Sequence, residues 1–182
     1  MKTVIFYLVL LALGTSHAQE FTELKEAKVG FAPMASSVER NGNSFSFNVK
    51  EAVVGEFEKD PLAFMENYFS IDDFIAELKP EQYDRYEVSF VSQKGQLIAD
   101  FDKDGTLLQT NSRFKNTLLP YNLRKDLYRD HKGWAMTKNI RITRGEKGEV
   151  TKDYYKVNLE NGKDRKRIVL QAPLSVTDIA SN

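Results

Sequence analysis

The sequence contains no cysteine and only two histidines among its 182 residues. Without cysteine, neither disulfide bonds nor thiolate metal sites can hold the fold. Because His17 lies in a segment that we expect to be removed, His131 is the single histidine left for zinc binding or for a hydrolytic triad. His131 follows an expected helix, where a cation interacts favourably with the helix dipole. The sequence therefore predicts no metal site and no histidine-dependent catalysis.

Apolar runs long enough to cross a membrane are also missing beyond the N-terminus. The N-terminus has Lys2, an apolar run over residues 3–13, and the small residues Ser16 and Ala18 at the spacing of a signal-peptide cleavage site. The run is too short for a membrane anchor. We expect a signal peptide over residues 1–18, and hence a secreted or periplasmic protein whose mature chain has no membrane span.

Phosphate-binding motifs are lacking as well, because the chain has neither a P-loop nor a dinucleotide fingerprint. Acidic residues are plentiful, but no spacing selects a carboxylate pair of the kind that cleaves glycosidic bonds. We therefore expect a protein that is not an enzyme and uses no cofactor. The alternative is a secreted hydrolase that uses acidic residues alone. It predicts two carboxyls that converge in a cleft, at least one of them with a displaced pKa.

Charge is balanced over the whole chain but divided between its halves. Residues 19–110 contain 9 Lys or Arg against 18 Asp or Glu, whereas residues 111–182 contain 16 against 8. Such halves can form two faces that attract each other within one fold, or a dipolar surface that orients partners. We do not expect nucleic acid as a partner, because the protein is predicted to be exported and its net charge is not basic.

Aromatic residues are abundant, with 12 phenylalanines and 8 tyrosines, so an apolar core must supply the stability of the fold. The Asn-Gly pair at residues 41–42 separates two alternating segments and predicts a β-hairpin. Farther along, Asp60 can cap a helix with Pro61 in its first turn, and Ser70 can cap a second helix. We expect two short helices, or one bent helix, between residues 60 and 80.

Alternating apolar residues predict two groups of three strands in the rest of the chain. The first group is RYEVSFVSQKGQLIADFDKDGTLLQT, with turns at the glycines of residues 95 and 105. A helix that Pro120 opens comes next. The second group covers residues 134–173, with Gly145, Gly148 and Gly162 expected in its turns.

A helix followed by three strands thus occurs twice, which suggests a duplication. The segments YEVSFVSQKG and YYKVNLENGK share a tyrosine–x–valine pair before a turn. Residues 71–78 fit the duplication least well, because a strict repeat requires a strand there and the hydrophobic period predicts a helix. We expect an α+β fold, an antiparallel meander sheet with helices packed on one face, built from two degenerate α-β-β-β repeats. The predicted organisation is a signal peptide (1–18), a lead-in with a β-hairpin (19–57), a first repeat (58–110), a second repeat (111–175) and a flexible tail (176–182).

Short motifs in both groups of strands give the chain a family resemblance. The run LLPYNLRKDLYRDHKGW, NIRITRG, DYYKVNLENGK, RKRIVL has a leucine–proline helix start and then a meander with Y-x-V-x-L before a glycine turn. The segment YEVSFVSQKGQLIADFDKDGTLL looks like the same meander from a preceding unit. Over roughly residues 60–174 the chain resembles the secreted bacterial PepSY-like domains, also described as β-lactamase-inhibitor-protein-like.

The resemblance implies an exported α+β protein, with a helix packed on one face of an antiparallel sheet, that binds or inhibits other proteins. It carries over no catalytic residues. The end of the chain departs from the family pattern, because RIVLQAPLSV contains no D-x-DG.

The stretch DFDKDG begins like the calcium loop of an EF-hand, with Asp100, Asp102 and Asp104 at positions 1, 3 and 5 and glycine at position 6. Position 12 is Asn111, which has no carboxylate, and the flanking segments are predicted strands rather than helices. We expect instead a β-hairpin whose turn is capped by the side chain of Asp102. Weak calcium binding by the three aspartates stays an alternative.

Alternation along the last three strands selects the candidate binding residues. If Ile140 and Ile142 point toward the core, Arg141 points away from it, and the same argument applies to the two following strands. The predicted exposed face carries Arg141, Tyr154, Lys156, Arg165 and Arg167.

Arginine and tyrosine are enriched at the centres of protein interfaces. The alternative is an ordinary solvated face whose charges keep sheet edges from pairing. The function we expect is an exported, non-catalytic binding or inhibitory module that engages a protein or a cell-envelope component through this face. The alternatives are the acidic hydrolase and a weak calcium-binding structural module.

Overall fold

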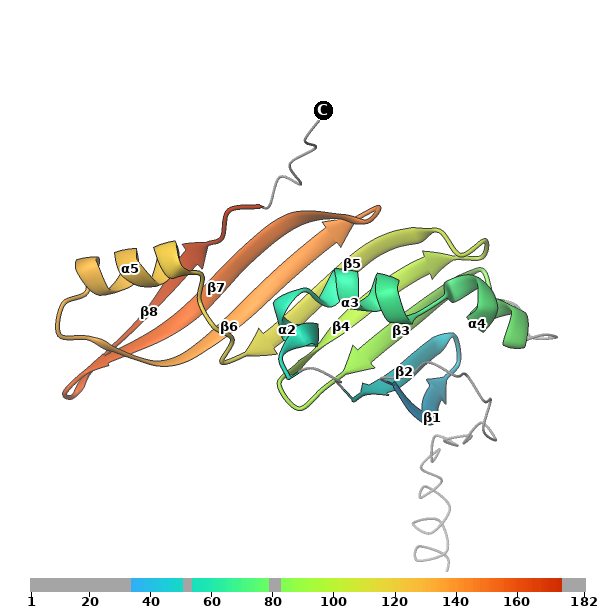
Figure 1. Ribbon diagram of the computed structural model, residues 1–182, viewed down its shortest axis with the longest axis horizontal. Coiled ribbons are helices and arrows are strands. Elements are labelled where there is room, and N and C mark those ends of the chain that lie inside the picture. Colours follow the sequence, from blue (N-terminus) through green and yellow to red (C-terminus); the bar gives the residue numbers. More distant parts are fainter. Residues whose placement is uncertain (1–33, 51–53, 79–82, 175–182) are drawn as a thin grey trace, which may run out of the picture.

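The computed structural model describes residues 34–50, 54–78 and 83–174, with the side chains of residues 34–39 excepted. The expected signal peptide, residues 19–33 and 51–53 of the lead-in, and the expected tail lie outside these residues. Within them the chain forms four helices and eight strands (Figure 1). The helices are α2 (Glu56–Lys59), α3 (Pro61–Tyr68), α4 (Ile71–Glu77) and α5 (Tyr121–Asp130). The strands are β1 (Met34–Asn41), β2 (Ser44–Val49), β3 (Arg85–Val91), β4 (Gly95–Asp102), β5 (Leu107–Lys115), β6 (Ala135–Glu146), β7 (Glu149–Asn161) and β8 (Asp164–Gln171).

The eight strands form one sheet in which spatial order follows chain order, from β1 to β8. The predicted α+β class, the predicted hairpin and the antiparallel meander are confirmed. One strand pair differs from the prediction, because β2 and β3 run parallel. The helices α2, α3 and α4 lie between these two strands in the chain. A parallel pair requires a crossover of this kind, whereas an antiparallel pair can be joined by a tight turn.

Local signals account for most of the element boundaries. The Asp60 side chain accepts a hydrogen bond from the Ala63 amide and caps α3, which begins at Pro61. The Ser70 hydroxyl accepts one from the Asp73 amide and caps α4, so the segment after residue 70 is a helix. The short helix α2 was not predicted from the sequence. It has only four residues and no capping side chain, so no local signal marks it.

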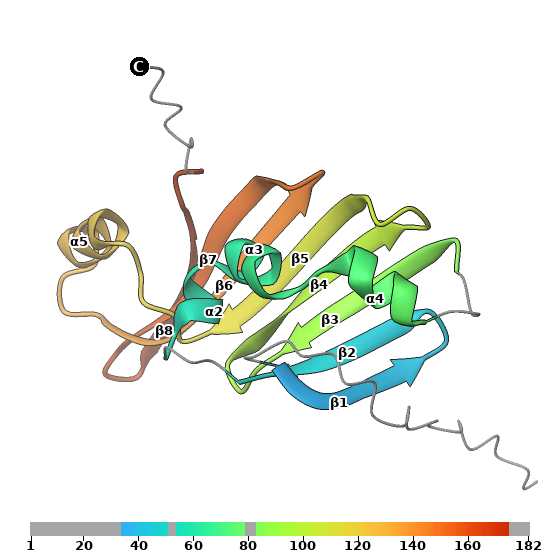
Figure 2. The same ribbon diagram turned by 45° about the vertical axis from the view of Figure 1, so that its right-hand side comes forward.

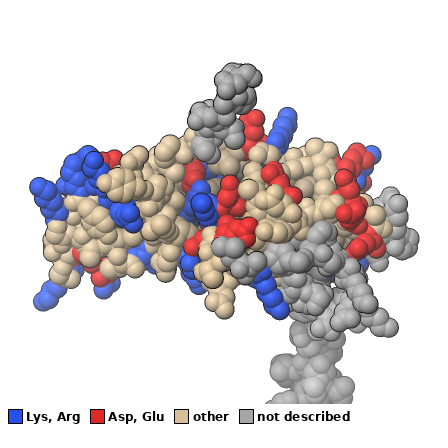
Figure 3. All heavy atoms as spheres, in the orientation of Figure 1, with Lys and Arg blue, Asp and Glu red and all other residues tan. Residues whose placement is uncertain are grey.

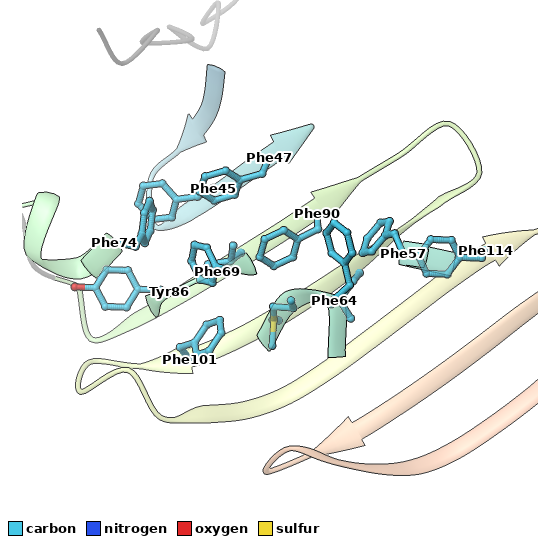
Figure 4. Packing of buried hydrophobic residues seen from close by; sticks show 14 residues of the cluster. Phe45, Phe47, Phe57, Phe64, Phe69, Phe74, Tyr86, Phe90, Phe101 and Phe114 are labelled. Atoms are coloured by element: carbon cyan, nitrogen blue, oxygen red, sulfur yellow. The ribbon is translucent and has the colours of Figure 1, made fainter. Parts of the chain in front are cut away.

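An aromatic core joins α2, α3 and α4 to strands β2–β5 (Figures 2 and 4). Phe47 of β2 stacks on Phe90 of β3, with 5.7 Å between ring centroids. Phe74 of α4 meets Phe45 edge-to-face at 4.9 Å, and Phe57 of α2 reaches Phe114 of β5 at 5.0 Å. Helices α2 and α4 are therefore each held on the sheet by a buried phenylalanine, and Phe64 of α3 packs on Phe57 of α2.

A second, smaller apolar cluster holds α5 against β7 and β8. It contains Leu127 of α5 together with Tyr155, Val157 and Leu159 of β7. In the register of the sheet Phe114 pairs with Arg141 and Arg141 pairs with Tyr155, so the three side chains lie on one face. The two clusters therefore cover the same face of the sheet, which we call the helix face.

The opposite face of the sheet, which we call the bare face, carries no helix of the part of the chain that the structure describes (Figure 2). Side chains alternate between faces along each strand, and the register aligns them across the sheet. One row across the bare face is formed by Ser89, Ile98, Asn111, Arg144 and Lys152.

Because strand order follows chain order, the charge division of the sequence becomes a division in space. On the helix face, Lys and Arg gather over α5, and Asp and Glu gather over α4 (Figure 3). The acidic side chains of α4 are Asp72, Asp73 and Glu77. The acidic and basic residues are thus separated on this face along the direction in which the strands are stacked.

Candidate binding surfaces

The bare face of strands β5–β8 is rich in cations. Lys115, Ile140, Lys156 and Val169 form one row across the four strands. The neighbouring row contains Arg113, Ile142, Tyr154 and Gln171. We call this surface the basic face, and its Lys and Arg residues are Arg113, Lys115, Lys138, Arg144, Lys152, Lys156, Arg165 and Arg167. Its acidic residues are Glu146, Glu149 and Glu160.

Most cations of the basic face are exposed to solvent and form no strong ion pair within the described chain. Arg165 pairs with Glu160 at 3.4 Å in a solvated contact, and Arg167 donates a hydrogen bond to the Asn158 side chain. Arg113, Lys115 and Lys138 form no ion pair with any other residue that the structure describes. The basic face therefore presents an excess of uncompensated positive charge.

A shallow hollow of about 430 Å³ lies where the basic face meets the β3–β4 turn. Arg113, Lys115 and Lys138 line it together with Ile140, and the turn residues 91–95 form its wall. Lys94 also lines it, but its ammonium pairs with Glu58 at 2.8 Å. All charged side chains of this lining are basic. The hollow is therefore suited to a negatively charged group.

Four of the five predicted binding residues lie where the sequence placed them. Tyr154, Lys156, Arg165 and Arg167 are on the bare face, and the Lys156 ammonium lies 5.9 Å from the ring centroid of Tyr154. Arg113, Lys115 and Lys138 were missed. The alternation around the buried Phe114 would have placed Arg113 and Lys115 on the same face.

The prediction for Arg141 was wrong, because its side chain lies on the helix face. The register with β5 decides the face to which each side chain of β6 points. Phe114 is fully buried under α2 and pairs with Arg141, whereas Arg113 pairs with Ile142. Ile140 and Ile142 therefore point to the bare face, not toward the core. Ile142 is only 7% exposed there, and Arg113 and Tyr154 flank it in the register.

Arg141 occupies a gap between the two apolar clusters, where all three nitrogen atoms of its guanidinium donate hydrogen bonds. Its Nε and Nη2 donate to the two carboxylate oxygens of Asp153 at 3.1 and 2.7 Å. Its Nη1 donates to the main-chain carbonyl of Lys59 at 2.7 Å and to that of Glu58 at 3.4 Å. These carbonyls end α2, so the cation also lies at the negative end of that helix dipole.

Burial and charge shift the pKa of two groups at this position. Burial acts to lower the pKa of Arg141, but the hydrogen bonds and charge of Asp153 act in the other direction, and the pKa lies above its ordinary value. Burial raises the pKa of the Tyr155 hydroxyl, and the nearby Arg141 only partly offsets this rise. Arg141 stays a cation and Tyr155 stays a neutral phenol near pH 7.

A cleft of about 640 Å³ opens above Arg141, Asp153 and Tyr155. We call it the helix cleft. One wall is the start and end of α2 with the preceding turn, and the other is the connection into α5 with the first turn of that helix. The remaining lining residues are Val54, Gly55, Glu58, Lys59, Thr117, Leu118, Leu119, Pro120, Tyr121, Arg124, Ala172 and Pro173.

The helix cleft bears on the hydrolase alternative, because it contains two carboxylates. Asp153 accepts both of its ion-pair hydrogen bonds from Arg141, and Glu58 pairs with Lys94. The second carboxylate oxygen of Glu58 is buried without a hydrogen-bond partner among the described residues. Each of the two carboxylates therefore forms an ion pair with a cation of the protein.

The stretch around Asp100 forms the predicted hairpin between β4 and β5. The Asp102 carboxylate accepts hydrogen bonds from the amides of Asp104 and Thr106, at 3.0 and 2.8 Å, and Gly105 adopts a φ of 81°. The Asp100 carboxylate lies on the bare face and accepts a hydrogen bond from Gln109. Among the described residues no group of three acidic or histidine side chains is placed to hold a metal ion.

The helices that the structure describes include none that is long and apolar enough to cross a membrane. Comparisons of the chain with protein-family models, with curated proteins and with solved structures find no match.

Proposed function

We propose that the chain is an exported, non-catalytic binding or inhibitory module of the PepSY-like type, and that it engages an acidic protein through the basic face. The order of elements supports the proposed duplication, because α4 precedes β3–β5 and α5 precedes β6–β8. The single observation that carries the proposal is the basic face itself: eight cations, three acidic residues and no covering helix among the described elements.

The composition of the basic face favours a protein over a simple polyanion. Ile140, Tyr154 and Val169 lie within the rows of cations, and Val169 is 53% exposed. Protein interfaces combine apolar and aromatic centres with a charged surround, whereas a polyanion needs only the charges. The cations would attract an acidic surface and orient it, and the apolar side chains would add contacts that survive at higher salt.

Binding of two synthetic polypeptides tests this proposal. Poly-L-glutamate supplies charge alone, whereas a glutamate–tyrosine copolymer supplies charge with aromatic groups. We expect the copolymer to bind more tightly than poly-L-glutamate by about fivefold or more, since one aromatic contact at an interface contributes at least about 1 kcal/mol. The double substitution Tyr154→Ser, Val169→Ser should abolish this preference and leave the binding of poly-L-glutamate unchanged.

The affinity for dextran sulfate, a polyanion, distinguishes a protein partner from a polyanion of the cell envelope. If it binds as tightly as the copolymer, and the double substitution affects neither, the apolar centre plays no part and the protein-partner proposal is wrong. Leu108→Ser with Tyr128→Ser, two exposed apolar residues, is the matched control. It should leave all three affinities at the wild-type value.

A further inference from the structure

Exposed apolar side chains gather at the helix cleft. Val54 is 92% exposed, Leu118 79% and Tyr121 68%, and all three line it. They are the three most exposed large hydrophobic residues of the described chain. Single exposed hydrophobic residues are common on protein surfaces, but a group of them around one concave site is typical of a binding site for an apolar ligand.

The volume of the helix cleft fits a small molecule. At about 640 Å³ it lies within the range of about 300–1,000 Å³ that is usual for ligand pockets. The main-chain segments that form its walls come from three separate parts of the fold: the α2 region, the connection into α5, and the end of β8. Such a meeting of elements is a frequent position for a binding site.

The charges at the helix cleft favour an anionic ligand. Lys59 and Arg124 line it, and neither side chain forms an ion pair with another described residue. The acidic residues of the lining are compensated, since Glu58 pairs with Lys94 and Asp153 pairs with Arg141. The cleft therefore has two cations without an ion pair, whereas each of its carboxylates pairs with a cation.

Arg141 itself cannot serve as the receptor for an anion. Asp153 occupies the edge of its guanidinium that Nε and Nη2 form, and the carbonyl groups at the end of α2 accept from Nη1. A ligand anion would therefore be held by Lys59 and Arg124. The interior would receive the apolar part of the ligand, beside the ring of Tyr155, whose hydroxyl forms no hydrogen bond with another described residue.

We propose that the helix cleft binds a single-chain anionic amphiphile such as a fatty acid. The hydrocarbon chain packs against Val54, Leu118 and Tyr121, and the carboxylate is held by Lys59 and Arg124. This site is independent of the basic face, because its residues come from the helix-face side of the sheet.

Isothermal titration calorimetry with dodecanoate, below the concentration at which it forms micelles, tests the site. We expect one dodecanoate per chain. Dodecyltrimethylammonium has the same tail and the opposite charge, and it should bind at least about tenfold more weakly, which corresponds to one lost charge-assisted interaction. Equal affinity for the two amphiphiles, or no heat with dodecanoate, overturns the proposal.

Two substitutions and two controls locate the site. Leu118→Ser and Arg124→Glu should each weaken dodecanoate binding by about tenfold. Leu118 is largely solvated and Arg124 only half-buried, so neither change removes a buried contact of the core. The controls are Val169→Ser on the bare face and Lys125→Glu on the solvated side of α5. If the controls weaken binding as much as the two cleft substitutions do, the ligand binds elsewhere.

A short apolar peptide with a free carboxyl terminus is the alternative ligand to be measured, since it shares an apolar body and one carboxylate with a fatty acid. We expect it to bind more weakly than dodecanoate. If the peptide binds more tightly than dodecanoate and Leu118→Ser weakens it, the occupant is a peptide terminus and the fatty-acid proposal is wrong.

Discussion

Arg141 and Asp153 form a two-pronged ion pair across the neighbouring strands β6 and β7, with Nη2 2.7 Å from Oδ2 and Nε 3.1 Å from Oδ1. The pair is largely buried, with 19% and 9% of the two side chains exposed. The same guanidinium binds the last carbonyls of α2. This contact connects the helix layer of the first cluster to the strands that carry the second one.

Removal of Asp153 should therefore destabilise the fold strongly. Asp153→Ala leaves a buried arginine without its counter-ion, and we expect the free energy of unfolding to fall by about 3 kcal/mol. Urea denaturation provides the measurement. The control is Glu160→Ala, which breaks the solvated pair with Arg165 and should cost less than about 1 kcal/mol.

The joint replacement Arg141→Met, Asp153→Leu shows whether the loss in Asp153→Ala comes from an unpaired buried charge or from lost packing volume. A buried ion pair can often be replaced by apolar residues of similar volume at little cost. We expect this double variant to be more stable than Asp153→Ala. A double variant that is less stable than the single one would contradict our explanation of the single substitution.

Phe90 should be among the most sensitive positions of the aromatic core. It is fully buried and contacts the rings of Phe47 and Phe69. Phe90→Ala should reduce the free energy of unfolding by about 4 kcal/mol, because a cavity replaces the ring. Val169→Ala on the bare face should change it by about 0.5 kcal/mol or less. Similar losses at the two positions would show that the helix face does not contain the core.

Gly95 should not tolerate a side chain, although its backbone needs no left-handed conformation. A Cβ there would overlap the carbonyl oxygen of Arg113 and lie 2.7 Å from the Cα of Phe114. We expect Gly95→Ala to lower the free energy of unfolding by about 3 kcal/mol. Gly42→Ala is the control: it has open space but a φ of 62°, and should cost about 1 kcal/mol. Thermal or urea unfolding that ranks the two variants in the opposite order would contradict the close approach of β4 to β5.

The turn aspartate Asp102 should make stability depend on acid pH. The amide of Thr106 lowers the pKa of its carboxyl, desolvation opposes this, and the amide of Asp104 lowers it further. A carboxyl with a lowered pKa in the folded state stabilises the fold at pH values above its unfolded pKa of about 4. This stabilisation is lost as the pH falls through the lower, folded value.

Asp102→Asn measures this contribution directly. We expect the variant to be less stable than the wild type at pH 7, and the difference in urea midpoint to shrink steadily below about pH 4. A difference that stays constant down to pH 2 would mean that the charge of Asp102 does not stabilise the turn.

The sequence predicts elements whose signals are local. Alternation and glycine turns predicted strands β3–β8, and the caps at Asp60 and Ser70 predicted α3 and α4. The parallel pairing of β2 with β3 was not predictable in the same way, because it depends on a crossover and not on the residues of either strand. Helix α2 lacks a capping signal and is held in place by Phe57 and by distant Arg141.

The candidate site shows the same division between local and long-range information. Local alternation placed the isoleucines at residues 140 and 142 on the inner face of β6. The pairing of Arg141 with Phe114 and Tyr155 instead puts Arg141 on the helix face and the isoleucines on the bare face. Ile142 is buried on the bare face between Arg113 and Tyr154, and these neighbours come from other strands, so local hydrophobicity does not reveal them. Residues on β7 and β8 were placed correctly because Val157, Leu159 and Ile168 do point toward α5.

Charge reversal on the basic face tests our central claim most directly. The variant Lys115→Glu, Lys138→Glu, Lys156→Glu is compared with Lys125→Glu, Lys132→Glu, Lys166→Glu, which changes the net charge equally at exposed positions away from the bare face. The measurement is the affinity for the glutamate–tyrosine copolymer at about 50 and 500 mM salt. At low salt we expect the first variant to bind at least tenfold more weakly than the second, roughly the effect of 1.4 kcal/mol. Equal affinities of the two variants would show that the bare face is not the binding surface.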